Sequence, residues 1–72
     1  MKKYYVSTRA KHNGDHEVHI ELCHYLPGLQ KRHYLGDFFC CTEALEKAKQ
    51  HYDQVNACRF CSALCHTVRK NT

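Results

Sequence analysis

The chain has 72 residues, of which 11 are Lys or Arg and 7 are Asp or Glu, so its formal net charge is +4. It has no apolar stretch of about 18 residues, which excludes a membrane-spanning helix, and no apolar run follows the basic N-terminus as a secretory signal requires. We therefore expect a monomeric cytoplasmic protein with a single domain over residues 1–72. A core of this size barely offsets the conformational entropy of folding, so a further stabilising element is expected.

Cysteine and histidine are the enriched residue types, with six cysteines and seven histidines in the chain. In a reducing cytosol, cysteines serve as metal ligands, small buried side chains or reactive thiols. In an oxidising compartment the same six cysteines would instead form a framework of disulfides. The composition therefore points first to a metal site, with disulfides as the alternative.

Three short β-strands are predicted in the first half of the chain. Residues 4–10 are rich in β-forming side chains, and residues 17–22 alternate between apolar and polar types. Asn13-Gly14 lies between them and favours a tight hairpin turn with positive φ at both positions. Residues 34–39 form a third β-like run. We expect these strands to make a small antiparallel sheet.

One main helix is predicted over residues 42–54. Thr42 is a typical N-cap, and Glu43 suits the positive end of the helix dipole. Leu45, Ala48 and Tyr52 recur at helical spacing on one face. The predicted fold class is α+β, with about three antiparallel strands, one helix and a C-terminal C-x2-C knuckle. Because aliphatic residues are sparse, we expect the five tyrosines and three phenylalanines to fill the core and flank the sheet.

Two short motifs together supply four metal-ligand side chains. Cys58-x2-Cys61 places two thiolates in one tight turn, and His19-x3-Cys23 follows the second predicted strand. The C-x2-C pair follows the helix and does not open it, so the dipole activation of a redox motif is missing. A set of three cysteines and one histidine is typical of structural zinc sites with no open position for catalysis. We therefore expect Zn²⁺ bound by these four residues.

Some assignments stay open at the level of sequence. His16, Cys65 or His66 could replace His19 as the fourth ligand. Cys40 and Cys41, just before the helix, are expected to be small buried side chains. A lowered thiol pKa near a helix N-terminus would instead make one of them a redox handle. No Gly-rich phosphate loop, G-x-S-x-G or H-E-x-x-H motif occurs in the chain, so we expect no enzyme.

The order of these motifs resembles the Ada-type metal-binding domain. The shared pattern is H-x3-C, a leucine-bearing loop, an aromatic strand, a helix of E-A-x-E-x-A type and C-x2-C, over roughly residues 17–61. In that family the ligands are four cysteines, and the first accepts a methyl group from DNA; its position here is His19. The resemblance thus implies the metal site without the methyl transfer. The chain is also similar to short uncharacterised bacterial proteins with N-G-D-H-E-V-H and C-x2-C-x3-C-H motifs.

The predicted function is a small structural-zinc interaction module without catalysis. The Ada-type resemblance implies nucleic acid as the partner, bound weakly because the net charge is small. Phosphate contacts are assigned to three basic residues, and base stacking to tyrosines on an exposed sheet face: Arg9, Lys31 and Arg32, with Tyr4, Tyr5 and Tyr34. The alternatives are a thiol-active protein that uses Cys40, Cys41 or a zinc thiolate, and a module with a protein partner.

Overall fold

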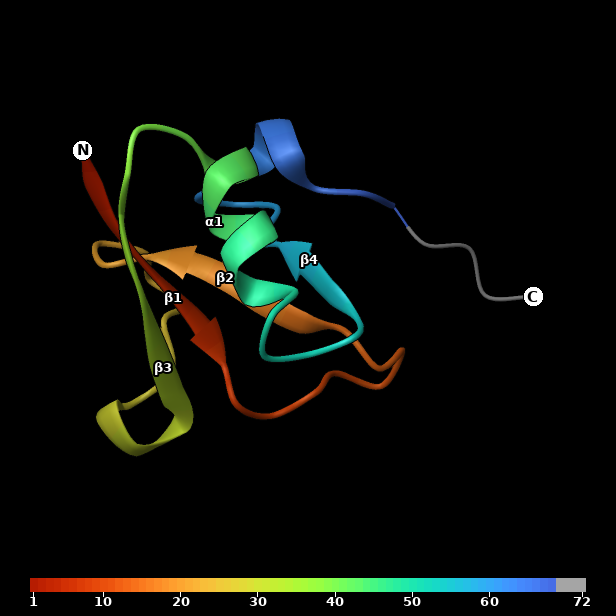
Figure 1. The fold of residues 1–72 in the computed structure, drawn as a ribbon. Coiled ribbons are helices and arrows are strands. Elements are labelled where there is room, and N and C mark those ends of the chain that lie inside the picture. The colour runs from red at the N-terminus through yellow and green to blue at the C-terminus, as the bar shows by residue number, and fades with distance from the viewer. Residues whose placement is uncertain (69–72) are drawn as a thin grey trace.

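The computed structural model describes residues 1–68, which form a four-stranded sheet with one α-helix across one face (Figure 1). The elements in chain order are β1 (Lys2–Ser7), β2 (His16–Ile20), the 3-10 turn η1 (Leu29–Lys31), β3 (Arg32–Phe38), α1 (Cys41–Ala48), β4 (Val55–Ala57) and the 3-10 turn η2 (Ala63–Cys65). The α+β class is as predicted. Within residues 1–68, no helix is both long and apolar enough to cross a membrane.

The sheet is mixed, in the order β3-β1-β2-β4. β1 pairs antiparallel with β2 and with β3, whereas β4 runs parallel to β2. The three predicted strands are present and pair antiparallel, but the prediction of about three strands missed the parallel strand β4. β4 was not predicted, because three residues are too few to show a periodic pattern. A parallel neighbour requires a crossover connection, and α1 provides it.

The connection between β1 and β2 is wider than predicted. Pairing between these strands ends at Val6 and Val18, which leaves a loop over residues 8–15. Gly14 has a φ of +91°, but no residue other than glycine has positive φ in the described chain. The prediction of a two-residue hairpin turn with positive φ at Asn13 as well is therefore wrong, because the chain closes through Gly14 alone.

Asp15 fixes this loop against β4. Its side chain is 1% exposed, and its carboxylate accepts hydrogen bonds from Asn13 Nδ2 (3.2 Å), Gln54 Nε2 (2.8 Å) and Asn56 Nδ2 (3.1 Å). A buried carboxylate is tolerated only when such donors replace its hydration. The backbone of Gln54 also accepts a bond from His16 N at 3.0 Å. These contacts hold residues 54–57 in the sheet.

The helix is shorter than predicted at its C-terminal end, and its cap differs. α1 covers Cys41–Ala48, whereas residues 54–57 belong to the sheet contacts described above. Cys40, not Thr42, occupies the N-cap position. The Glu43 carboxylate accepts hydrogen bonds from the backbone N–H groups of Phe39 (3.2 Å) and Cys40 (3.3 Å). Tertiary contacts thus override the helical periodicity beyond Ala48.

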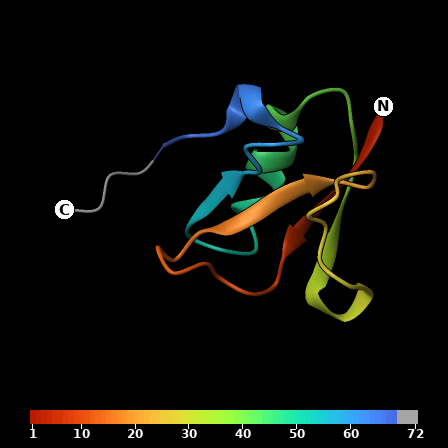
Figure 2. The ribbon, with the colours of Figure 1, turned by 180° about the vertical axis from the view of Figure 1, so that it is seen from behind.

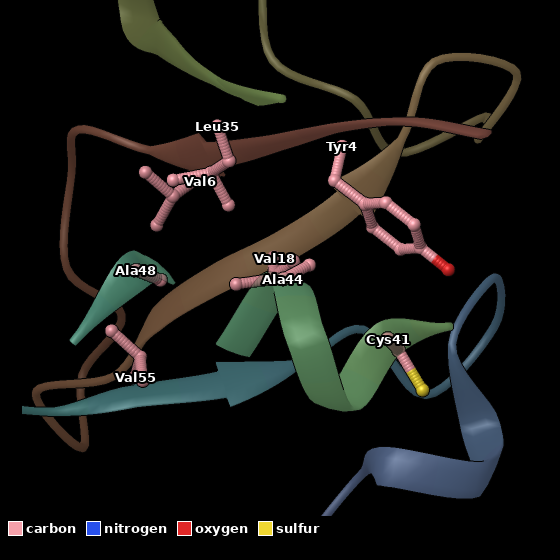
Figure 3. Packing of buried hydrophobic residues seen from close by; sticks show 8 residues of the cluster. All are labelled: Tyr4, Val6, Val18, Leu35, Cys41, Ala44, Ala48 and Val55. Carbon is pink, nitrogen blue, oxygen red and sulfur yellow. The ribbon is translucent and has the colours of Figure 1, made fainter. Parts of the chain in front are cut away.

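The core lies between α1 and the sheet and is built largely of small side chains (Figure 3). Ala44 and Ala48 are fully buried and let the helix approach Val6 and Val18 closely. Tyr4 is the single aromatic residue in the buried set, and Phe38 and Tyr52 pack against that set; the other five aromatic residues are half-buried or exposed. The expectation that the aromatic residues fill the core therefore holds for Tyr4 and in part for Phe38 and Tyr52, whereas Phe39 and Phe60 are exposed.

A disulfide joins Cys41, the first residue of α1, to Cys65 in η2, 24 residues later. Cys41 is buried as predicted, but it is covalently paired. The expectation that all six cysteines stay out of disulfides is wrong for this pair. Spacing alone does not indicate which cysteines pair, because the contact depends on how η2 packs on α1.

Candidate metal centre

The parallel pairing of β2 with β4 creates the candidate site. Val18 pairs with Ala57, and Cys58 N donates to Val18 O at 2.9 Å, so the two strands end side by side. Figure 2 shows this pair from the side away from α1. His19 lies in β2, and Cys23 follows that strand in the next loop. Cys58 and Cys61 follow β4, so the carboxyl ends of the two strands carry all four side chains.

The structure brings the four predicted ligand residues together. One donor atom from each of His19, Cys23, Cys58 and Cys61 lies within 4.8 Å of all the others. Cys23 Sγ is 3.5 Å from His19 Nδ1 and 3.8 Å from Cys58 Sγ. His19 and Cys58 are buried, and the other two are half-buried. This group could hold a metal ion.

Each cysteine sulfur in the group accepts a backbone hydrogen bond. Ile20 N donates to Cys61 Sγ, Tyr25 N donates to Cys23 Sγ, and Phe60 N donates to Cys58 Sγ, each at 3.4 Å. The Phe60 bond closes the turn that begins at Cys58, together with a bond from Ser62 N to Cys58 O at 2.9 Å. Backbone N–H groups aimed at sulfur stabilise the thiolate form, which is the form that binds metal.

Two charged side chains, Glu17 and Lys11, orient His19. Its Nδ1 faces Cys23 Sγ, and its Nε2 lies 3.6 Å from Glu17 Oε1. Glu17 Oε2 in turn lies 3.2 Å from Lys11 Nζ. A carboxylate behind the second ring nitrogen holds the histidine tautomer whose other nitrogen has a free lone pair. Sequence reasoning missed Glu17 and Lys11, although Glu17 lies two residues from His19 on the same strand face.

Burial shapes the protonation of the group. It lowers the pKa of His19 from 6.5, against the opposing effect of Glu17, so the imidazole favours the neutral form that donates a lone pair. It also raises the pKa of Cys23 to about 12, with neighbouring Cys61 and Cys58 adding to the rise. The Cys23 thiol therefore resists ionisation unless a cation compensates its charge.

The alternative fourth ligands are engaged elsewhere. His16 Nδ1 lies 2.9 Å from Ser7 O, and its ring stacks on Tyr52 with centroids 3.8 Å apart. Cys65 is bonded to Cys41. His66 Nδ1 lies 2.8 Å from Ala57 O. Among residues 1–68, the group that could hold a metal contains His19 and none of these three residues.

The three basic residues assigned to nucleic acid converge at one end of the β1–β3 pair. Ser7 pairs with Arg32, and Thr8 N donates to Lys31 O at 3.0 Å. Arg9 N donates to the Ser7 hydroxyl at 3.3 Å, which places Arg9 beside them. Arg9 and Lys31 are exposed, and Arg32 is half-buried.

Two tyrosines adjoin this basic end on the sheet face turned away from α1. Tyr5 and Tyr34 pair across the strands with ring centroids 5.3 Å apart. The Arg32 guanidinium lies 4.8 Å from the Tyr5 ring, and Lys3 Nζ lies 5.7 Å from the Tyr34 ring. Tyr4 points into the core, as the expectation of core packing has it, and so cannot stack on a base. Lys3 was not among the predicted contacts.

Comparison with protein-family models, with curated proteins and with solved structures gives no match for this chain. The likeness to the Ada-type domain therefore rests on motif spacing and element order, and it stays a prediction.

Proposed function

We propose that the chain is a small interaction module whose fold is held by one structural zinc ion on His19, Cys23, Cys58 and Cys61. The spacing of the donor atoms carries this proposal. Around a tetrahedral zinc, two thiolates at ~2.3 Å lie about 3.8 Å apart, and a thiolate and an imidazole nitrogen lie about 3.6 Å apart. The corresponding distances are 3.8 Å between Cys23 and Cys58 and 3.5 Å between Cys23 and His19.

The chemistry of the donor set favours zinc over harder cations. Calcium and magnesium take oxygen ligands, whereas thiolates and imidazole suit zinc. The three N–H···S bonds and the Glu17 carboxylate behind His19 provide the outer contacts expected of such a centre. Four protein ligands fill a tetrahedral ion, so the bound metal would supply structural stability and no turnover.

Metal titration of the purified chain tests this proposal. Zinc or cobalt should bind at one equivalent, and removal by a chelator should unfold the chain, because structural zinc contributes on the order of 10 kcal/mol in small domains. Cys58→Ser should abolish binding. Cys40→Ser is the matched control, since Cys40 is a free, exposed cysteine outside the group. Amide dispersion that survives complete metal removal would contradict the proposal.

The partner supported by the β1–β3 face is single-stranded nucleic acid. The paired rings of Tyr5 and Tyr34 offer a stacking platform, with Lys3 and Arg32 beside the rings and Arg9 next to Ser7 at the end of β1. With so few cations, binding should be weak, indifferent to sequence and lost at moderate salt. Tyr34→Ala should weaken the binding of an oligothymidine measured at low salt. No detectable binding of single- or double-stranded oligonucleotides would favour a protein partner instead.

A thiol-active role is the alternative, and the disulfide is the observation that favours it. Cys40 is exposed and lies beside Cys41, whose sulfur is bonded to Cys65. Thiol titration of the metal-loaded protein separates the two functions. Ligand cysteines should react only after a chelator removes the metal. Rapid modification of Cys40, with reversible opening of the disulfide in mild thiol buffer, would support the alternative.

A further inference from the structure

An apolar surface surrounds the turn between Cys58 and Cys61. It consists of exposed large side chains from five separate segments of the chain, which we call the Phe60 surface: Met1, Leu22, Tyr25, Phe39, Phe60 and Leu64. Leu22 is 84% exposed and Leu64 is 100% exposed, so neither contributes to the core. Single exposed apolar residues need no explanation, but a contiguous group of them marks an interaction site.

Shallow hollows show that these side chains form one continuous surface. A hollow of about 390 Å³ lies between Leu22, Tyr25 and Phe60. A second, of about 300 Å³, lies on the other side of Phe60 and reaches Phe39 and Leu64. A third, of about 250 Å³, shares Leu22 with the first hollow and Lys2 with the second. Phe60 therefore stands as a ridge between two apolar hollows.

The Phe60 side chain is already fixed in the unbound chain. The Phe60 ring stacks on Tyr25 with centroids 4.5 Å apart, and the Arg59 guanidinium lies 5.4 Å from the same ring. The backbone N–H of Phe60 is bound to Cys58 Sγ. An anchor fixed in this way loses little conformational entropy on binding, which favours affinity.

The charges and side-chain types at the Phe60 surface indicate which kind of molecule binds there. Lys2, Lys3 and Arg59 border the surface, and Glu21 is the one carboxylate lining the three hollows within the described chain. A second copy would bring an equal set of cations against them, which disfavours self-association. A nucleic acid could stack on Tyr25 and Phe60, but it has no apolar side chain to fill the two hollows or to cover Leu22 and Leu64, so a peptide with apolar side chains fits better.

We propose that the Phe60 surface binds a segment of a partner protein that carries two bulky apolar side chains flanked by Asp or Glu. The two apolar side chains enter the hollows on either side of Phe60, and the acidic residues face Lys2 and Arg59. The inference rests on the proposed metal module, because Phe60 lies between two of its ligands. It adds a partner class to that module, at a surface that adjoins the β1–β3 face through Lys3.

The test uses the full zinc-loaded chain and three synthetic peptides followed by amide chemical shifts. The first peptide has two Leu or Phe residues among Asp and Glu, the second replaces the acids by Lys, and the third replaces the apolar residues by Ser. The first alone should bind, with shifts centred on Leu22, Phe60 and Leu64. Equal binding of the acidic and basic peptides, or binding of none, would overturn the proposal.

Matched variants localise the effect. Leu22→Ala should weaken the acidic peptide at least about fivefold, and Phe60→Ala at least about tenfold. Leu29→Ala is the control, because Leu29 is similarly exposed at 79% but lies in η1, outside the hollows. An equal loss in the control, a concentration-dependent dimer, or an oligonucleotide that displaces the peptide would refute it. Zinc content is measured in the same samples. Loss of peptide binding with full zinc occupancy would refute the Phe60 surface alone, whereas loss of zinc would refute the metal module.

Discussion

Glu17→Gln probes the contact that orients His19. The Glu17 carboxylate lies 3.6 Å from His19 Nε2 and 3.2 Å from Lys11 Nζ. The amide keeps the size of the side chain but removes its charge, so the tautomer that leaves Nδ1 available to the metal loses its stabilisation. Removal of such an outer partner typically lowers metal affinity 10- to 100-fold, which corresponds to about 1.4–2.7 kcal/mol.

Competition with a chromophoric zinc chelator measures this change. Glu21→Gln is the matched control, because it removes the same charge from an exposed position of the loop that follows β2. The control should stay within about twofold of the unmodified chain. If both variants bind zinc equally well, the carboxylate does not orient the ligand and the assignment of Nδ1 as the donor atom loses its support.

The other predictions concern stability and pH. Asp15→Ala should lower the free energy of unfolding by about 2–4 kcal/mol, measured by urea denaturation, because buried amide donors lose their acceptor; Asp53→Ala, at an exposed position, should have little effect. Removal of the Cys41–Cys65 disulfide by Cys65→Ser should cost about 3 kcal/mol in the same assay, since it removes a covalent link across 24 residues; an unchanged midpoint would show that the disulfide does not stabilise the fold. Burial lowers the pKa of His19 from 6.5. The contribution of His19 to metal binding is therefore fully present above pH 6.5, and it is lost only as the pH falls through the lowered pKa. Protonation of the His19 ring, monitored by its imidazole proton resonances, should thus begin only below pH 6.5; protonation at or above pH 6.5 would contradict the burial argument.

The ligand set could be predicted from the sequence because its signals are local. H-x3-C and C-x2-C are spacings that tight turns impose, and they identify His19, Cys23 and the Cys58–Cys61 pair without knowledge of the sheet. The parallel strand that brings these two halves together could not be predicted. β4 is only three residues long, and it is held by the contacts of Asp15 with Gln54 and Asn56 across 39 and 41 residues of sequence.

The errors about the helix and the aromatic residues have the same origin. Tyr52 continues the helical spacing of Leu45 and Ala48, yet the chain leaves the helix because residues 54–57 have better partners in the sheet. Composition predicts that aromatic side chains fill a core poor in aliphatics. Ala44 and Ala48 instead let α1 pack so closely that little space remains, and Phe60 is left on the surface.

Native mass spectrometry of the chain, purified without added metal, tests the central claim most directly. The account predicts one zinc ion per chain, together with the loss of two hydrogens for the Cys41–Cys65 disulfide. The ligand thiols of Cys23, Cys58 and Cys61 should resist alkylation until a chelator is added. A metal-free chain in which these cysteines react at once, or in which they pair as further disulfides, would contradict the proposed zinc module.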